Sequence, residues 1–320
     1  MDNLLQKLIS RHSCLASGHR SCRGCLPVPV VARHILRATD KPVIVACATS
    51  CMEVTTTPYP QTAWRVPWIH SVFANAAATM GGVVSAYEAL KERGKLAKIS
   101  KKLARISDLK FVAFGGDGGS YDIGLQSLSG ALERQENFLY VCYNNEAYQN
   151  TGNQRSGATP YGAATTITPP DDVSFGKPQF RKNLTEIVAA HNIPYVAQTA
   201  VSAWQDLYEK AKKAFAIRGP AFINILAPCT LGWKFPPNMG VEISRLAVET
   251  CFWPLYEVEN GKYKLNYQPK NPRPVTDFLK LQGRFKHLFS SHPRNKKILQ
   301  EIQEKVDLEW EKLLKKCKKK

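Results

Sequence analysis

The stretch that decides the fold runs from Phe111 to Asn145 and reads FVAFGGDGGSYDIGLQSLSGALERQENFLYVCYNN. The apolar run Phe111–Phe114 predicts a buried strand that ends in a glycine-rich turn. Ile123–Arg134 has helical spacing, and Phe138–Tyr143 predicts a second strand. Strand, turn, helix and strand in this order are typical of two parallel strands joined by a crossover helix.

The same alternation continues on both sides of that unit. Apolar runs predict three further strands, and helical spacing predicts five further helices. The strands are Val43–Ala48, Tyr195–Ala200 and Ala221–Leu226, and the helices are Asn3–Arg11, Val30–Arg37, Phe73–Arg93, Leu184–His191 and Ala203–Arg218. We therefore expect an α/β fold with an open, mostly parallel sheet and helices on both faces. In such sheets, ligands bind beyond the carboxyl ends of the strands.

The remaining segments lack a regular pattern. Prolines and aromatic residues break up Pro58–Trp68, so we expect no regular element there, and Tyr148–Pro178 predicts a long irregular loop. From about Gly240 the sequence is charged, aromatic and broken by proline, which we interpret as an extension that wraps around another part of an assembly. We divide the chain into an N-terminal arm with an irregular cysteine loop (residues 1–42), an α/β core (residues 43–235) and a C-terminal extension that makes subunit contacts (residues 236–320).

Composition and charge limit the class of protein. Of the 320 residues, 44% are apolar and 22% are charged, which is ordinary for a globular protein. No apolar run reaches the roughly 18 residues of a membrane span, and no secretory signal opens the chain, so we expect no membrane span and a cytoplasmic location. The net charge is +18. The densest basic run, Lys91–Lys110, favours a solvated helical face, with an acidic protein partner or nucleic acid as alternatives. None of the usual nucleic-acid-binding motifs occurs, so we expect no nucleic-acid partner.

A glycine-rich turn carries the strongest functional pattern. Gly116-Asp117-Gly118 and Asn145, separated by 26 residues, each follow a predicted strand. A carboxylate and an amide oxygen are suitable Mg²⁺ ligands. The glycines let backbone approach a diphosphate, and the helix after Ser120 can direct its N-terminus toward that anion. The alternative is an ordinary turn and an asparagine loop. We expect Asp122 to cap the following helix rather than to bind the metal.

The cysteines suggest a second site. Nine cysteines, an odd number without a secretory signal, fit a disulfide scaffold poorly. Cys22 and Cys25 form a C-x-x-C motif, and Cys51 and Cys229 each follow a predicted strand. Four thiolates can hold a zinc ion or a [4Fe–4S] cluster, and the spacing by itself favours zinc slightly.

Longer stretches identify a family. The Gly-Asp-Gly motif with its later asparagine resembles the thiamine diphosphate motif of thiamine-dependent enzymes. Three segments resemble the β subunit of pyruvate:ferredoxin oxidoreductase, a 2-oxo acid:ferredoxin oxidoreductase. They are GGDGGSYDIGLQSLSGALERQENFLYVCYNNEAYQNTGNQRSGATP (Gly115–Pro160), TPYPQTAWRVPWIH (Thr57–His70) and LAVETCFWPLYEVENGKYKL (Leu246–Leu265). The resemblance covers essentially the whole chain.

The resemblance implies the residues of two sites. Mg²⁺ would be held by the Asp117 carboxylate, by Asn145 and by the Ala147 carbonyl, and Asn150 would lie near the reacting end of the cofactor as a catalytic residue. The residues expected to contact thiamine diphosphate are Ser50, Gly116, Asp117, Gly118, Gly119, Asn145 and Asn150. The cysteines assigned to one [4Fe–4S] cluster are Cys22, Cys25, Cys51 and Cys229. The chain has Leu26 and Ser50 where the family usually has glycine, which bears on the cluster loop geometry and not on the ligands.

The resemblance also implies a reaction. As the β subunit of an anaerobic hetero-oligomer, the chain would serve coenzyme A-dependent oxidative decarboxylation of pyruvate or a close 2-oxo acid, with electrons passing through the cluster to ferredoxin. The glutamate that activates the cofactor in this family lies on another subunit, so we expect the chain alone to be inactive. Two alternatives stay open: a non-redox thiamine-dependent decarboxylase or synthase with a structural zinc site, and a basic scaffold or nucleic-acid-binding protein.

Overall fold

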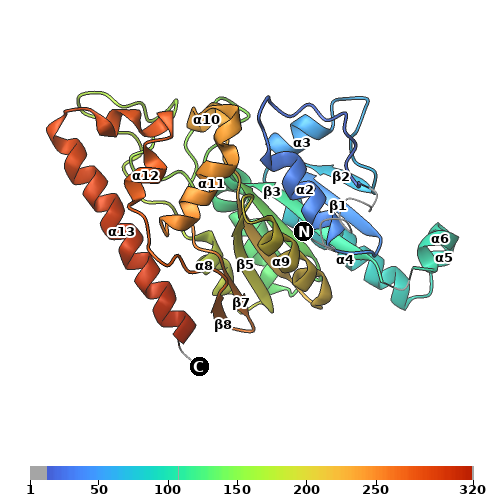
Figure 1. The fold of residues 1–320 in the computed structure, drawn as a ribbon. Helices are drawn as coiled ribbons and strands as arrows, with labels where there is room; N and C mark the ends of the chain where they lie inside the picture. The colour runs from blue at the N-terminus through green and yellow to red at the C-terminus, as the bar shows by residue number, and fades with distance from the viewer. Residues whose placement is uncertain (1–12, 107, 319–320) are drawn as a thin grey trace, which may run out of the picture.

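The computed structural model describes residues 13–106 and 108–318, and one eight-stranded sheet forms its centre (Figure 1). The strands are β1 (Val43–Ala48), β2 (Trp68–Ser71), β3 (Lys110–Gly116), β4 (Leu139–Asn144), β5 (Tyr195–Ala200), β6 (Ala221–Leu226), β7 (Tyr256–Glu259) and β8 (Lys262–Leu265). Their spatial order is β2-β1-β3-β4-β6-β5-β7-β8. The strands from β2 to β5 in that order pair in parallel, and β7 and β8 are antiparallel. This confirms the open, mostly parallel α/β fold.

Helices flank the sheet on both faces. They are α2 (Pro27–Arg37), α3 (Cys51–Thr56), α4 (Ala76–Glu92), α5 (Leu96–Ile99), α6 (Lys101–Ala104), α7 (Leu125–Glu133), α8 (Leu184–Ala189), α9 (Trp204–Ala216), α10 (Thr230–Trp233), α11 (Gly240–Glu249), α12 (Val275–Leu279) and α13 (Pro293–Lys318), with a π-helical turn η1 (Gly118–Ile123) and 3₁₀ turns η2 (Pro237–Met239) and η3 (Gly283–Phe289). The predicted helix Asn3–Arg11 lies outside the described residues. In the part of the chain that the structure describes, no helix has the length and apolar content needed to cross a bilayer.

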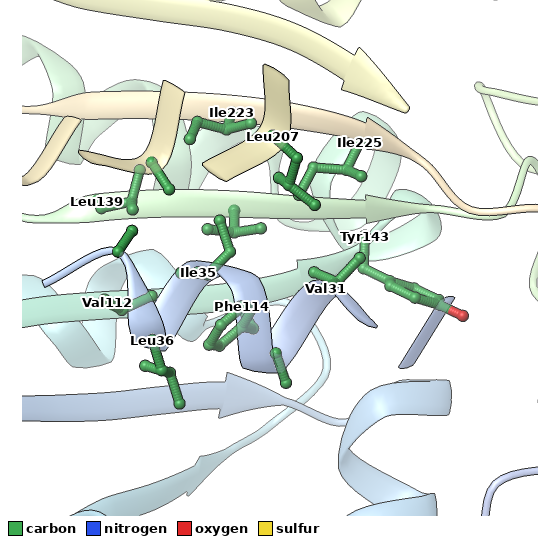
Figure 2. Close-up of a cluster of buried hydrophobic side chains, with 14 of the residues drawn as sticks. Val31, Ile35, Leu36, Val112, Phe114, Leu139, Tyr143, Leu207, Ile223 and Ile225 are labelled. Carbon is green, nitrogen blue, oxygen red and sulfur yellow. The ribbon is translucent and has the colours of Figure 1, made fainter. Parts of the chain in front are cut away.

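The alternation of side chains along each strand explains the layers. Val112 and Phe114 of β3 pack on the face covered by α2 and α9, where Ile35 is fully buried (Figure 2). Phe111 and Ala113 of the same strand point to the other face, toward α4 and α7. Because both faces are covered, the central strands are apolar almost throughout, and this is the pattern by which the sequence predicted them.

The C-terminal segment completes the sheet. β7 pairs with β5, and β8 follows through a tight turn at Asn260-Gly261, where both residues have positive φ angles of 48° and 79°. Asn-Gly is the dipeptide that such hairpin turns prefer. The sequence analysis did not predict that β7 and β8 belong to the sheet of this chain. The interpretation of the segment as an extension that makes subunit contacts stays a prediction. The division at residues 42 and 235 stays a prediction.

Of the short elements that were not predicted, two lie next to β1. β2 begins at Trp68, at the end of the proline-rich stretch that we expected to be irregular, and it pairs with β1 at one edge of the described sheet. An edge strand tolerates a preceding proline, since the Pro67 carbonyl still accepts a hydrogen bond from Val45 N (2.9 Å). The second is α3, which Ser50 begins as its N-cap.

Candidate functional site

The carboxyl ends of four neighbouring parallel strands bring the predicted site residues to one edge of the sheet. Ser50 follows β1, Asp117 follows β3, Asn145 follows β4 and Cys229 follows β6. These strands are adjacent in the order β1-β3-β4-β6. The sheet therefore places residues that are far apart in the sequence at the edge where ligands bind in this class of fold.

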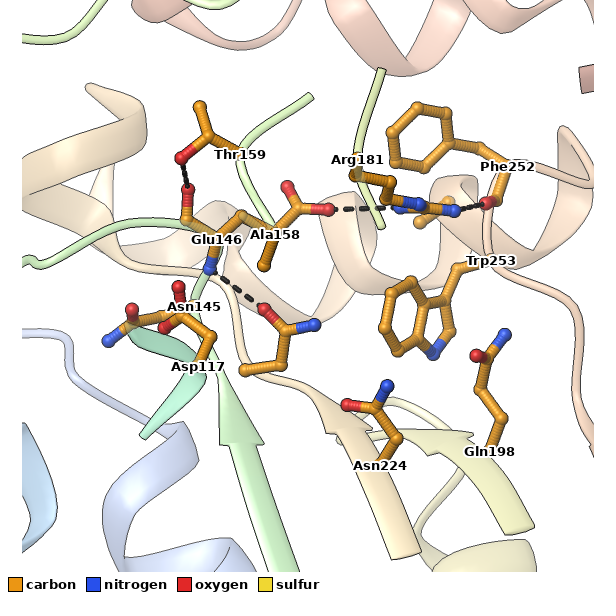
Figure 3. Close-up of polar contacts among 12 residues, drawn as sticks. Asp117, Asn145, Glu146, Ala158, Thr159, Arg181, Gln198, Asn224, Phe252 and Trp253 are labelled. Carbon is orange, nitrogen blue, oxygen red and sulfur yellow. Dashed lines mark hydrogen bonds and ion pairs between the residues drawn. The ribbon is translucent and has the colours of Figure 1, made fainter. Parts of the chain in front are cut away.

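Three oxygen atoms face one another at this edge. The amide oxygen of Asn145 lies 2.8 Å from the carbonyl oxygen of Ala147 and 2.9 Å from Asp117 Oδ1. Figure 3 shows Asn145 beside Asp117. Octahedral Mg²⁺ binds oxygen at about 2.0–2.1 Å, so neighbouring ligands of one ion stand roughly 2.9 Å apart. The Asn145 oxygen therefore lies at the spacing of Mg²⁺ ligands from each of the other two oxygens, and the three residues are those that the resemblance implies as metal ligands. Without a cation, the same contacts would require the Asn145 amide to rotate and donate to both oxygens.

Asp117 is held in a low-polarity setting. Its side chain is buried, and Ser156 Oγ donates to Asp117 Oδ2 at 2.5 Å. Burial raises the pKa of this carboxyl to about 8. A buried carboxylate needs a compensating charge, and a divalent cation among the three oxygens would supply it.

The glycines of the motif have a packing reason. A Cβ atom at Gly118 would lie 2.2 Å from the Tyr148 ring, and one at Gly119 would lie 2.8 Å from the Phe73 carbonyl oxygen. A Cβ at Gly116 would lie 3.3 Å from Ser50 Cβ. These close approaches allow the π-helical turn η1 to pack directly beneath the loop after β4. Contact of the glycines with a cofactor stays a prediction.

The remaining predicted residues are placed as follows. Ser50 Oγ accepts a hydrogen bond from Glu53 N at 3.4 Å and so caps α3. Asn150 is exposed in a turn that Tyr148 N closes by donating to Gln154 O. In the described part of the chain, no contact joins Asn150 to the three oxygens, so its catalytic role stays a prediction.

The prediction that Asp122 caps a helix is wrong. Its carboxylate accepts hydrogen bonds from Gly157 N at 2.8 Å, Lys182 Nζ at 2.8 Å and Tyr148 Oη at 3.1 Å. Asp122 lies inside the π-helical turn, where its side chain reaches the long loop instead of the helix start. It therefore fixes the loop over the site.

Glu146 is a site residue that the sequence reasoning missed. It lies between two predicted metal ligands, has a positive φ of 61° and is fully buried. Its carboxylate binds Arg284 Nη2 at 2.6 Å and Arg181 Nη1 at 3.1 Å, and Thr159 Oγ1 donates to its carbonyl at 2.6 Å. Figure 3 shows the contacts that run from Glu146 through Arg181 to the Phe252 carbonyl. The strained backbone beside an expected metal ligand was the signal, but it is visible only in the structure.

The four predicted cluster cysteines lie near one another, and Cys51 lies beside Asn145. Asn145 Nδ2 donates to Cys51 Sγ at 3.6 Å, and Gly232 N donates to Cys229 Sγ at 3.3 Å. Burial, together with the charges of Cys229 and Cys25, raises the pKa of the Cys51 thiol to about 12. Burial also raises the pKa of Cys229, with Cys25 and Cys22 adding to the shift. Cys51 and Cys229 therefore lie close enough to other cysteines of the set for a neighbouring thiolate to disfavour ionisation of their own thiols.

The C-x-x-C loop has room for a bound group. An open cavity of about 480 Å³ borders Cys22 and Cys25. Two polar atoms of the same loop, His19 Nδ1 and Ser21 Oγ, are buried without a hydrogen-bond partner. Buried polar atoms normally have partners, so this loop fits an additional group with hydrogen-bond acceptors.

Comparisons with known proteins agree with this geometry. Residues 49–225 match the family described as "Thiamine pyrophosphate enzyme, C-terminal TPP binding domain". The chain is 50% identical over 279 residues to pyruvate synthase subunit PorB of Methanocaldococcus jannaschii, across 87% of this chain and 91% of that relative. It is 49% identical over 317 residues to the subunit of the same name from Thermotoga maritima, across 97% and 94%. This chain belongs to the PorB family.

The fold of this PorB-family chain also occurs in a solved structure. A 2-oxoglutarate:ferredoxin oxidoreductase from Magnetococcus marinus matches with a TM-score of 0.50 and 18% identity, over 90% of this chain and 92% of that one. The thiamine pyrophosphate domain, residues 49–225, contains Asp117, Asn145 and Cys51. Cys22 and Cys25 lie before it and Cys229 lies after it in the sequence, so the four cysteines come from that domain and from the segments on either side.

Proposed function

We propose that this chain is the catalytic β subunit of a pyruvate synthase, and that it holds thiamine diphosphate with Mg²⁺ and one [4Fe–4S] cluster. The overall reaction converts pyruvate and coenzyme A to acetyl-CoA, carbon dioxide, one proton and two electrons, which leave for ferredoxin. The observation that carries the proposal is the Asn145 side chain. Its oxygen faces Asp117 and Ala147, and its nitrogen donates to Cys51.

Different residues of this chain would bind the metal and close the loop over the site. The Asp117 carboxylate, the Asn145 amide and the Ala147 carbonyl would hold the metal that carries the diphosphate. Bound thiamine diphosphate supplies the carbanion chemistry that a 2-oxo acid needs for decarboxylation. Tyr148 and Asp122 keep the loop closed over the site through their hydrogen bond of 3.1 Å. The role of the protein is therefore to position the cofactor and to exclude water.

The cysteines would provide the electron acceptor. A bound cluster supplies one-electron chemistry next to the cofactor, with Cys22, Cys25, Cys51 and Cys229 as thiolate ligands. A structural zinc ion is the alternative occupant of four thiolates. Iron and zinc analysis of the purified complex distinguishes the two assignments.

The chain would act only within its complex, in the cytoplasm. The activating glutamate and the residues that bind the substrate carboxylate are expected on another subunit, so turnover by the isolated, reconstituted chain would contradict the proposal. Pyruvate is the proposed substrate because the sequence relatives carry the name pyruvate synthase.

Electron paramagnetic resonance of the anaerobically purified complex tests the cluster. We expect a reduced [4Fe–4S] signal after dithionite, lost in Cys229→Ser and retained in Cys317→Ser. Cys317 is the control because it lies at the end of α13, which packs against β8 and not against β1 or β6. A silent complex that contains zinc, or a signal that survives Cys229→Ser, would overturn the cluster assignment.

A further inference from the structure

A partly open cavity lies beneath α13. Its volume is about 350 Å³. The wall on the core side comes from Phe180 to Glu186 and from Cys251 to Pro254, and α13 forms the other wall. Figure 1 shows α13 along the side of the molecule opposite α2 and β2. We call this space the α13 cavity.

α13 is fixed at its two ends and spans the cavity between them. Near its start, Ile298 and Ile302 pack with the buried cluster that includes η3 and α12. Near its end, Leu313 packs with the cluster on the sheet face, and Lys316 binds Glu186. Val306 lines the cavity between these anchor points. Because α13 packs against the rest of the chain on both sides of the cavity, the helix holds this wall of the cavity in place.

The α13 cavity has aromatic residues in its interior and basic residues along α13. Phe252, Trp253 and Trp310 contribute apolar walls. Six basic and two acidic side chains line the cavity: Arg181, Lys182, Lys305, Lys312, Lys315 and Lys316 against Glu186 and Glu309. Cations therefore outnumber anions around an apolar interior.

Both acids are already engaged. Glu309 accepts from Lys305 at 3.0 Å and from Lys312 at 3.1 Å, so two lysines share one carboxylate. Glu186 accepts from two tyrosines as well as from Lys316. Arg181 is held on the core side by Glu146. Lys305 and Lys312 together carry one more charge than the Glu309 carboxylate that they share, so one positive charge on α13 is not neutralised by that acid.

We propose that the α13 cavity binds a small amphipathic monocarboxylate, a compound with an aliphatic or aromatic body and one carboxylate group. The volume lies at the lower end of the roughly 300–1,000 Å³ of ligand pockets, which limits the ligand to a small one. The apolar body enters between Trp253 and Val306. The carboxylate stays at the solvated lysines Lys305 and Lys312, because burying an ion without a partner is costly.

Calorimetric titration of the assembled complex with octanoate, and separately with octan-1-ol, tests the proposal. We expect octanoate to bind with one site per chain, and octan-1-ol to bind more weakly because it lacks the charge. Val306→Trp fills the cavity and should lower octanoate affinity more than ten-fold. Leu308→Trp is the matched control, since Leu308 is 47% exposed on the same helix, and it should leave affinity unchanged.

A second pair of variants tests the charge without changing the core. Lys305→Gln should lower octanoate affinity by roughly two- to five-fold, as for an exposed ion pair, and should leave octan-1-ol binding unchanged. Lys297→Gln, an 81% exposed lysine side chain on α13 outside the cavity, should change neither. No octanoate binding by the wild-type complex, or equal binding by Val306→Trp and Leu308→Trp, would overturn the proposal.

Discussion

Replacing Glu146 with glutamine should weaken Mg²⁺ binding although Glu146 is not itself an expected ligand. Its backbone joins Asn145 to Ala147, and its fully buried carboxylate binds Arg284 at 2.6 Å and Arg181 at 3.1 Å. The glutamine keeps the shape of the side chain and removes the charge. The two arginines then lose the group that fixes the loop.

The expected effect of Glu146→Gln on stability can be estimated from how deeply Arg284 and Arg181 are buried. Arg284 has a 3% exposed side chain, and its guanidinium lies 3.8 Å from the Trp233 ring centroid, so water cannot replace the lost carboxylate. Removing one partner of a buried ion pair costs about 3–5 kcal/mol. Arg181 is partly exposed and retains its bond to the Phe252 carbonyl, so it adds less. Residues that orient metal ligands typically contribute about 10- to 100-fold to metal affinity, and we expect a loss in that range.

The assay is a Mg²⁺ titration of the complex with thiamine diphosphate present, followed by tryptophan fluorescence, beside urea unfolding. Glu257→Gln is the matched control. Glu257 is also a buried acid, bound by Lys213 at 2.6 Å and Tyr195 at 2.8 Å, but it lies on β7 away from the oxygens. Both variants should unfold at lower urea, and only Glu146→Gln should need more Mg²⁺. Equal Mg²⁺ midpoints in the two variants would refute the reasoning.

Three further changes have expected outcomes. Gly118→Ala places a Cβ 2.2 Å from the neighbouring tyrosine ring, whereas Gly82→Ala meets nothing within 4 Å, so only the first should weaken thiamine diphosphate binding in a titration, by at least about ten-fold. Burial lowers the pKa of Lys177 to about 8, well below that of an unfolded lysine. The unfolded chain therefore holds more protons between about pH 8 and 10, and wild-type stability relative to Lys177→Met should rise with pH in that window; a difference in urea unfolding that stays flat would contradict this. Lys98 and Lys102 are exposed on α5 and α6, and exposed charges are screened by salt. Added salt, or the double change to glutamate, should weaken subunit assembly or slow ferredoxin reduction, and kinetics that respond to neither would rule out a docking role for these lysines.

The central strands could be predicted from the sequence because burial on both faces leaves an uninterrupted apolar run. Val43–Ala48, Tyr195–Ala200 and Ala221–Leu226 have the same bounds in the structure. The sequence did not predict β7 and β8 because their composition is mixed. β8, an edge strand, has exposed lysines. The one local signal for the two strands was the Asn-Gly turn. Edge strands depend on a partner that is distant in the sequence, which local patterns do not report.

The candidate site also has features that could be predicted from the sequence and features that could not. The position of Asp117, Asn145 and Cys51 at one edge of the sheet could be predicted because each follows a strand end, and parallel strands gather their carboxyl ends. Their roles as ligands stay predictions. Glu146 could not be predicted, since its partners Arg181 and Arg284 are 35 and 138 residues away in the chain. A buried ion pair requires two residues that are distant in the sequence to meet, and only the folded chain shows that they do.

The chemistry of Asn145 explains why an amide suits this position better than a carboxylate. Its oxygen lies 2.9 Å from Asp117 Oδ1, and its nitrogen donates to Cys51 Sγ at 3.6 Å. An aspartate would keep the oxygen ligand but would set a negative charge against both Asp117 and the Cys51 sulfur. Like charges at this separation in a buried site oppose each other strongly. A neutral amide presents an acceptor to a cation on one side and a donor to a thiolate on the other, so one side chain can serve two neighbouring anionic sites without adding charge to either.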